Sequence, residues 1–186
     1  MADALTGEQI RLNYQDYCAL PDDGRRYEIL DGELIVSPSP GTSHQVVIGN
    51  LFMMLWNHVR RARLGRVYIA PLDVLLAEHS IVQPDLIYVS AANLHIIGKN
   101  NIRGIPDLLI EVVSPTRPEL DLRDKRQVYA RLGVPWYWII DPERREVLEL
   151  QLAGAAYAEV GRAQGTVVFE PKLFPGLRID LAELWQ

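Results

Sequence analysis

The chain has 186 residues, of which 48% are hydrophobic and 23% are charged, and its formal net charge is −5. This composition is typical of a globular protein with a substantial core and excludes a disordered chain. Its apolar runs are too short to span a bilayer, no secretory signal pattern is present, and the single cysteine, Cys18, excludes an intrachain disulfide, so we expect a cytoplasmic protein.

The N-terminal part of the chain predicts an arm followed by a hairpin. Residues 1–24 are expected to form the arm with one helix, because Thr6 and Gln9 match a capping box. Asp31-Gly32 separates the strand-like runs 27–30 and 33–36, which is a strong β-hairpin signal. We expect residues 25–186 to form the core of a single domain that spans 1–186.

Helical and strand-like patterns then alternate to the end of the chain. The predicted elements are a helix over 44–63 closed by Gly65, strands over 66–77 and 81–89, a loop over 91–104, a strand over 107–113, a helix over 120–132 ended by Gly133, strands over 135–140 and 146–152, a hairpin over 154–169 and a closing segment over 171–186. This order predicts an α/β (α+β) fold with a central mixed sheet flanked by helices.

Three carboxylates lie inside the strand-like runs, namely Asp73, Asp85 and Glu111. An ionised group in an apolar strand is costly unless it is paired or bound to a cation. If the strands are neighbours, their carboxylates converge, and such hard oxygen ligands suit Mg²⁺ or Mn²⁺. The alternative for Glu111 is a salt bridge with an arginine such as Arg123, and the alternative for Asp85 and Asp73 is solvation at a strand end.

Basic residues are predicted to complete the site. Lys125, on the helix after Glu111, is one of three lysines in the chain, and a lysine can stabilise charge on a phosphate or help to position water. Its alternative role is to pair with Asp121 one turn earlier. Two arginine-rich groups, Arg60, Arg61, Arg63 and Arg66, and Arg117, Arg123, Arg126 and Arg131, fit either solvated helix faces or a rim for a phosphate backbone.

Several segments, taken in order, resemble the Uma-type restriction endonuclease family, which belongs to the PD-(D/E)XK nuclease superfamily. They are Tyr27–Glu33, Ser43-His44-Gln45, Pro71–Val74, Pro84-Asp85, Glu111–Pro115, Asp121, Lys125 and Tyr129, Gly133–Pro142 and Pro175-Gly176-Leu177. The resemblance implies a restriction-endonuclease-like core in the order α-β-β-β-α-β, with magnesium-dependent DNA cleavage and with Asp85 and Glu111 as metal ligands.

The sequence departs from this superfamily at one position. The superfamily places a lysine two residues after the second acid, whereas this chain has Val113 there, so Lys125 is expected to replace it. We expect His44, Glu28 and Tyr129 at the rim of the site. Alternatively, His44 caps the helix, Glu28 is an acid on the face of its strand, and Tyr129 packs in the core.

Two functions of different classes follow. The first is a metal-dependent endonuclease, a hydrolase acting on DNA with Mg²⁺ or Mn²⁺, in which Asp85, Glu111 and Lys125 are catalytic and Asp73 is a further ligand. The second is an inactive nuclease-fold module for binding or assembly, which Val113 and the acidic net charge favour. A metal-dependent hydrolase that acts on a smaller phosphoester is a further alternative to the endonuclease. A homodimer is expected in the first case, because two-fold pairing supplies two active sites.

Overall fold

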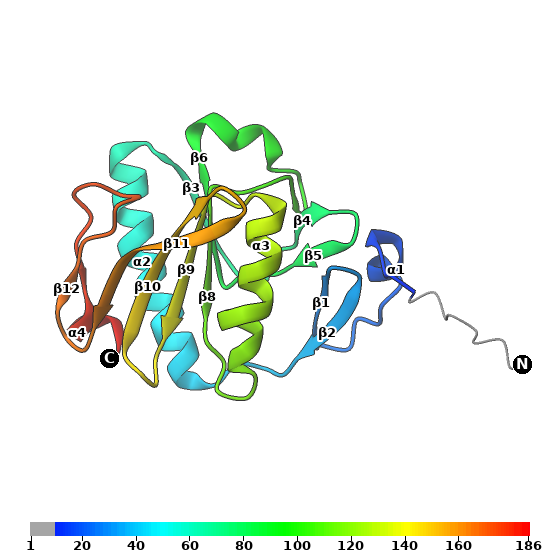
Figure 1. Cartoon of the computed structure of the whole chain (residues 1–186), viewed down its shortest axis with the longest axis horizontal. Helices are drawn as coiled ribbons and strands as arrows, with labels where there is room; N and C mark the ends of the chain where they lie inside the picture. Colours follow the sequence, from blue (N-terminus) through cyan, green and yellow to red (C-terminus); the bar gives the residue numbers. More distant parts are fainter. Residues whose placement is uncertain (1–9) are drawn as a thin grey trace, which may run out of the picture.

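The computed structural model describes residues 10–186 and contains two mixed layers of strands with helices packed around the larger one (Figure 1). The predicted Thr6–Gln9 capping box lies outside the described residues. The first described helix, α1 (Tyr14–Cys18), begins at a capping box formed by Asn13 and Asp16. In the described part of the chain, no helix is both long and apolar enough to cross a membrane.

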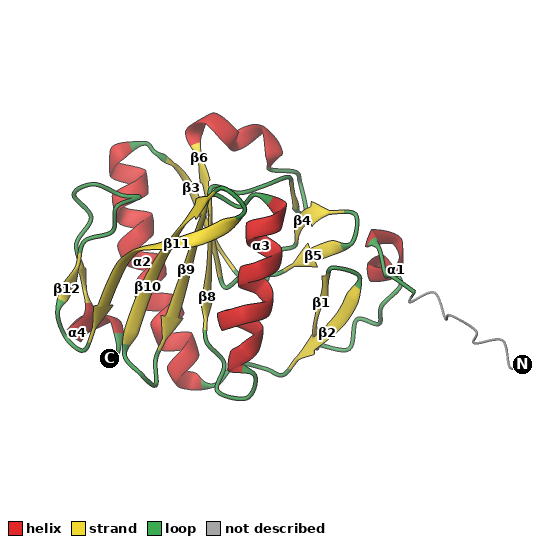
Figure 2. Ribbon diagram, in the orientation of Figure 1, coloured by secondary structure: helices red, strands yellow, loops and turns green. Residues whose placement is uncertain are grey.

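A six-stranded mixed sheet forms the centre of the molecule (Figure 2). Its order is β11 (Ala156–Gln164), β10 (Glu146–Ala153), β9 (Trp136–Asp141), β8 (Leu108–Val112), β6 (Leu86–Ser90) and β3 (Gly65–Ile69). Strands β8 and β9 run parallel, and the other neighbours run antiparallel. Strand β8 is buried along its whole length, as its apolar run predicted.

A second sheet of five strands lies beside the first and carries the predicted hairpin. Its order is β2 (Glu33–Ser37), β1 (Arg26–Leu30), β5 (Ser80–Val82), β4 (Val74–Ala77) and β7 (Ile102–Arg103). Asp31 and Gly32 both have positive φ, at 55° and 88°, which is the geometry that an Asp-Gly hairpin turn requires. Strands β12 (Val168–Phe169) and β13 (Ile179–Asp180) form a small separate pair.

Helices cover both faces of the six-stranded sheet (Figure 1). Helix α2 (Thr42–Ala62) packs Leu51 and Leu55 against one face. A π-helical turn, η2 (Leu120–Lys125), continues into α3 (Arg126–Leu132) and covers the other face. Two short helices, η1 (Ala91–Ile96) and α4 (Leu181–Leu184), complete the fold. The order α2-β3-β6-β8-α3-β9 is the predicted restriction-endonuclease-like α-β-β-β-α-β order.

Several predicted boundaries were wrong. The strands expected over 66–77 and 81–89 are each divided between the two sheets, because the chain turns at Pro71 and at Pro84-Asp85. Arg63, with φ 54°, caps α2, and Gly65 begins β3. The last hairpin joins β10 to β11 around Gly154 and does not span 154–169. The strand predicted over 135–140 is present as β9, and it is buried along nearly its whole length.

Gly65 occupies a position that excludes a side chain, and this leads to a prediction about stability. Its φ is 150°, and a Cβ atom would lie 2.1 Å from the carbonyl oxygen of Val89 on the neighbouring strand. We expect Gly65→Ala to lower the free energy of unfolding by at least about 2 kcal/mol in urea denaturation. The matched control is Gly49→Ala in α2, where a Cβ meets nothing within 4 Å, and which we expect to raise stability by up to about 1 kcal/mol. A neutral Gly65→Ala would contradict this assignment.

Candidate active site

A cavity of about 310 Å³ lies where the hairpin strand β1, the beginning of α2 and the start of η2 meet the ends of β6 and β8. The antiparallel register of β6 and β8 places Leu86 opposite Ile110, so Asp85 and Glu111 come next to each other at this edge. Both acids line the cavity although they are 2% exposed. The predicted convergence of these two strand carboxylates is therefore present.

Glu111 is held by two groups from the helix above it. Lys125 Nζ lies 2.9 Å from Glu111 Oε1, and the Tyr129 hydroxyl donates a hydrogen bond of 2.9 Å to the same oxygen. Lys125 is also 3.2 Å from Glu28 Oε1 and 3.7 Å from Asp121 Oδ1. One buried ammonium thus faces three carboxylates, and the predicted pairing with Asp121 exists beside the pairing with Glu111.

The π-helical turn accounts for the position of Lys125. The wider turn over Leu120–Lys125 places Asp121 and Lys125 on the buried side, and the Tyr137 hydroxyl fixes this turn by donating to the carbonyl of Asp121 at 2.9 Å. Such turns are rare and occur frequently at functional sites. Val113, at the position of the superfamily lysine, is buried in the apolar core, so the basic group near Glu111 comes from the helix.

Asp85 is held by groups from three other elements. Its Oδ2 accepts a 2.8 Å hydrogen bond from the backbone N–H of Val112, and His44 Nε2 lies 3.3 Å from the same oxygen. His44 Nε2 is also 3.0 Å from the carbonyl of Val112. Arg26 Nη1 lies 3.1 Å from Asp85 Oδ1. The first turn of α2 and strand β1 therefore both orient this carboxylate.

Arg26 is the central cation of the site and was not predicted from the sequence. Besides Asp85, its Nη2 lies 3.9 Å from Glu111 Oε2 and its Nε lies 3.9 Å from Glu28 Oε2. It also donates to the carbonyl of Gln83. The residue precedes Glu28 by two positions in β1, so both side chains leave the strand on the same side. This spacing of two residues from Glu28 is the one feature of the sequence that could have indicated a role for Arg26 in the site.

The environment separates the pKa values of the two strand acids. Burial raises the pKa of Glu111 to about 8, although Lys125 opposes this shift. Burial acts in the same direction on Asp85, but His44 and Arg26 outweigh it and hold its pKa below the usual range. Burial lowers the pKa of Lys125, yet the surrounding carboxylates, with Glu111 foremost, hold it above its usual range. Of these three groups, Asp85 and Lys125 are therefore the firmly charged ones.

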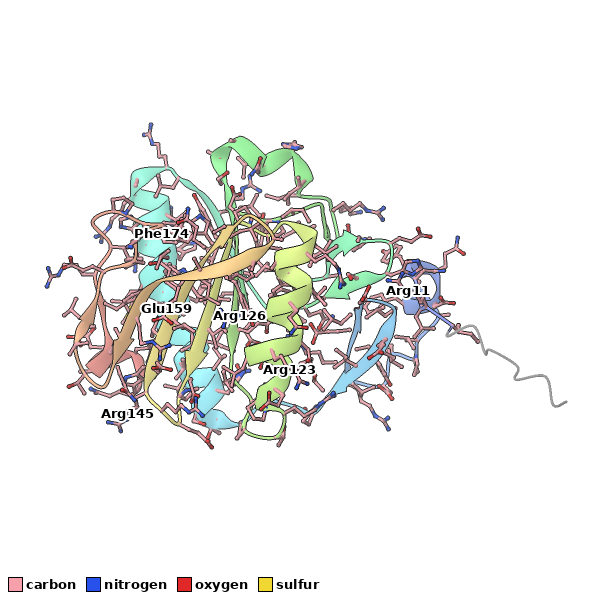
Figure 3. The ribbon with its side chains drawn as sticks, viewed as in Figure 1. Arg11, Arg123, Arg126, Arg145, Glu159 and Phe174 are labelled. Carbon is pink, nitrogen blue, oxygen red and sulfur yellow. The ribbon has the colours of Figure 1, made fainter. Side chains whose placement is uncertain are left out.

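The structure places the remaining predicted residues as follows. Glu28, His44 and Lys125 line the cavity, and Tyr129 lies behind Glu111. The cavity lining does not include Asp73, whose Oδ1 accepts hydrogen bonds from the Tyr17 hydroxyl at 2.7 Å and from Gln83 Nε2 at 2.8 Å. Arg123, considered as a partner of Glu111, is exposed on the outer side of the helix and pairs with Asp124 (Figure 3).

The carboxylates at this cavity are oxygen ligands of the kind that a divalent cation such as Mg²⁺ or Mn²⁺ prefers. Four buried carboxylates, Glu28, Asp85, Glu111 and Asp121, face only two permanent cations, Arg26 and Lys125. Glu28 Oε2 is buried and makes no hydrogen bond. Among residues 10–186, no three His, Cys, Asp or Glu side chains are grouped as a preformed metal site, and the Arg26 guanidinium lies between the carboxylates instead.

Comparisons with known proteins identify the family and the fold. A sequence model of the family described as "Uma2: Putative restriction endonuclease" matches residues 14–182. The fold is similar to a crystal structure described as a putative nuclease belonging to DUF820 from Anabaena variabilis, with a TM-score of 0.74 and 17% identity over 94% of this chain and 97% of that one. No curated protein sequence matches.

Proposed function

Because the chain belongs to the Uma2 family of restriction-endonuclease-like proteins, we propose that it is a metal-dependent endonuclease that hydrolyses phosphodiester bonds of DNA. The single observation that carries this proposal is the 2.9 Å contact between Lys125 Nζ and Glu111 Oε1, next to Asp85. Two strand acids and one lysine, the groups that the resemblance calls for, thus come together from separate elements although Val113 replaces the usual lysine.

Asp85 and Glu111 would hold a Mg²⁺ or Mn²⁺ ion, and Glu28 is the third carboxylate at the same cavity. A bound divalent ion neutralises charge on a phosphodiester and lowers the pKa of a coordinated water. Asp73, which the sequence suggested as a further ligand, is not part of the cavity lining, and we do not include it among the proposed ligands. His44 fixes the orientation of Asp85, and Tyr129 fixes that of Glu111. Lys125 positions Glu111 and, from the cavity wall, supplies positive charge toward a phosphate oxygen.

The alternative is a nuclease-fold module that binds without cutting. The position of Arg26 favours it, because this guanidinium neutralises the carboxylates that an ion would use. A homodimer, which would pair two sites for cleavage of both strands, stays a prediction for the enzyme.

The substrate is tested by incubating supercoiled plasmid DNA and a structured RNA separately with the protein and Mn²⁺. We expect nicking of the DNA, because the resemblance is to DNA-cleaving enzymes, and no cleavage of the RNA. Cleavage of the RNA alone would overturn the choice of DNA and keep the phosphodiester chemistry.

The central position of Arg26 predicts that it competes with a metal ion. We expect Arg26→Met to bind Mn²⁺ at least about tenfold more tightly than the wild type in calorimetry, since a hydrogen bond to a charged group contributes about 1.5–3 kcal/mol. The matched control is Arg25→Met, because Arg25 is 67% exposed and contacts Asp23 outside the cavity. Weaker Mn²⁺ binding by Arg26→Met than by the control would contradict competition and make Arg26 a support of the site.

A further inference from the structure

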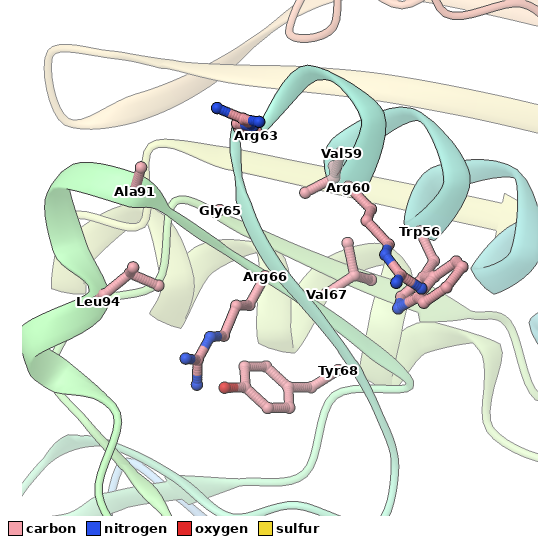
Figure 4. Close-up of a pocket in the computed structure, with 10 residues that line it drawn as sticks. All are labelled: Trp56, Val59, Arg60, Arg63, Gly65, Arg66, Val67, Tyr68, Ala91 and Leu94. Carbon is pink, nitrogen blue, oxygen red and sulfur yellow. The ribbon is translucent and has the colours of Figure 1, made fainter.

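A second concave site lies at the other end of α2, beyond the edge strand β3. The cavity has a volume of about 550 Å³, and its lining includes Arg60, Arg63 and Arg66 together with Trp56 and Tyr68. Figure 4 shows Trp56 and Arg60 on the helix on one side of β3, and Arg66 with Tyr68 on the other side. We call this site the arginine groove.

No carboxylate neutralises the arginine groove. The sequence contains no Asp or Glu between Glu33 and Asp73, although the whole chain is acidic. Among the ion pairs of the described residues, none involves Arg60, Arg63 or Arg66. By contrast, the exposed arginines Arg123, Arg131, Arg144, Arg162 and Arg178 each pair with a carboxylate. The groove therefore holds three arginines that have no acidic partner among the described residues, next to two aromatic side chains.

The dipole of α2 explains only part of this arrangement. Basic residues in the last turn of a helix are favourable, and Arg60 and Arg61 occupy that turn. Arg66, however, lies in β3 after the helix has ended, and Arg60 lies over the Trp56 ring at 4.6 Å from its centroid. Arginines that stack on aromatic rings and have no acidic partner are typical of surfaces that bind a nucleic-acid backbone.

We propose that the arginine groove binds the sugar-phosphate backbone of a nucleic acid, with Arg60, Arg63 and Arg66 contacting phosphates and Trp56 and Tyr68 offering faces for stacking. The identification of the polyanion as a nucleic acid rests on the proposed nuclease function. From His44 to Arg60 the helix advances about 24 Å, which corresponds to about seven base pairs of duplex. The groove is thus an anchoring site, separate from the carboxylates that would cut.

The test measures DNA binding without cleavage. Fluorescence anisotropy measures binding of a labelled DNA duplex in EDTA at several salt concentrations. The duplex has about 20 base pairs, which exceeds the distance from His44 to Arg60 along the helix. We expect Arg60→Gln, Arg63→Gln and Arg66→Gln combined to weaken binding at least about tenfold. The salt dependence of binding should also decrease. The slope of the logarithm of the binding constant against the logarithm of the salt concentration should become shallower by about 0.9 for each phosphate that an arginine no longer neutralises.

The matched control removes the same charge elsewhere, by combining Arg123→Gln, Arg131→Gln and Arg178→Gln. These side chains are 56–68% exposed, and we expect this variant to bind nearly as the wild type does. Arg66→Gln alone serves as a second groove variant if the triple variant unfolds. Equal weakening by the control, or unchanged binding by both groove variants, would overturn the proposal.

The outcome for the groove is independent of the proposed catalytic site. Loss of groove binding with no nicking by the wild type supports the groove and refutes the nuclease. Nicking that depends on Glu111, combined with unchanged binding by the groove variants, refutes the groove alone.

Discussion

Replacing Lys125 with Met is expected to destabilise the protein by about 3–5 kcal/mol, the cost of leaving buried charges without their partner. Lys125 is 2% exposed and faces Glu28, Glu111 and Asp121. The measurement is urea denaturation of metal-free protein at neutral pH. Arg123→Met is the control, because that side chain is 61% exposed and lies two residues away; we expect it to change stability by no more than about 0.5 kcal/mol.

The destabilisation by Lys125→Met should depend on pH. The pKa of Glu111 is raised to about 8 by burial even with the lysine present, and the lysine opposes this rise. A carboxyl whose pKa is higher in the folded state contributes stability at low pH and loses it as pH increases. The variant should therefore be closest to the wild type near pH 5 and furthest from it above pH 8. A deficit that is equal at both ends of this range would contradict the role of Lys125 as a counter-ion.

Replacing Asp85 with Asn is expected to weaken Mn²⁺ binding by more than about 100-fold, beyond the 10- to 100-fold typical of groups that only support a ligand. The amide keeps an oxygen for the Val112 N–H but loses the charge that His44 and Arg26 hold in place. Calorimetry with Mn²⁺ measures this loss. Retained affinity would exclude Asp85 as a ligand.

Asp73→Asn is the matched comparison for Asp85→Asn. Asp73 lies in the segment between β3 and β4, and its side chain accepts hydrogen bonds from Tyr17 and Gln83. We expect this variant to bind Mn²⁺ as the wild type does. A loss similar to that of Asp85→Asn would instead establish Asp73 as the further ligand that the sequence predicted.

The local sequence pattern was sufficient to identify β8, the buried strand that contains Glu111. An apolar run that contains one carboxylate and ends at Ser114-Pro115 predicted β8 and marked Glu111 as paired or bound. Lys125 was identifiable because lysine is rare in this chain, and the helix pattern placed it on the same face as Tyr129. The order of helices and strands around the sheet followed from the same periodicities, together with the resemblance.

The long-range part of the site could not be predicted in this way. Strand runs carry no information about which sheet a segment joins, so the division of 66–77 and 81–89 between two sheets was missed. The role of Arg26 depends on packing of β1 against the ends of β6 and β8, far along the chain. Arg123, the alternative partner of Glu111 that the sequence offered, pairs with Asp124 instead. The expected lysine lies next to Glu111, and the hairpin adds an arginine that the sequence did not indicate.

The most direct test of the central claim, that Asp85, Glu111 and Lys125 form a nuclease site, is nicking of supercoiled plasmid by wild type and by Glu111→Gln with Mn²⁺. The amide keeps the shape of the side chain and an acceptor for Tyr129, so folding can be verified by denaturation. We predict that the wild type converts the plasmid to open circles and that Glu111→Gln is slower by at least about 100-fold. Equal rates for both proteins, or a wild type that binds Mn²⁺ but leaves the plasmid intact, would contradict the account.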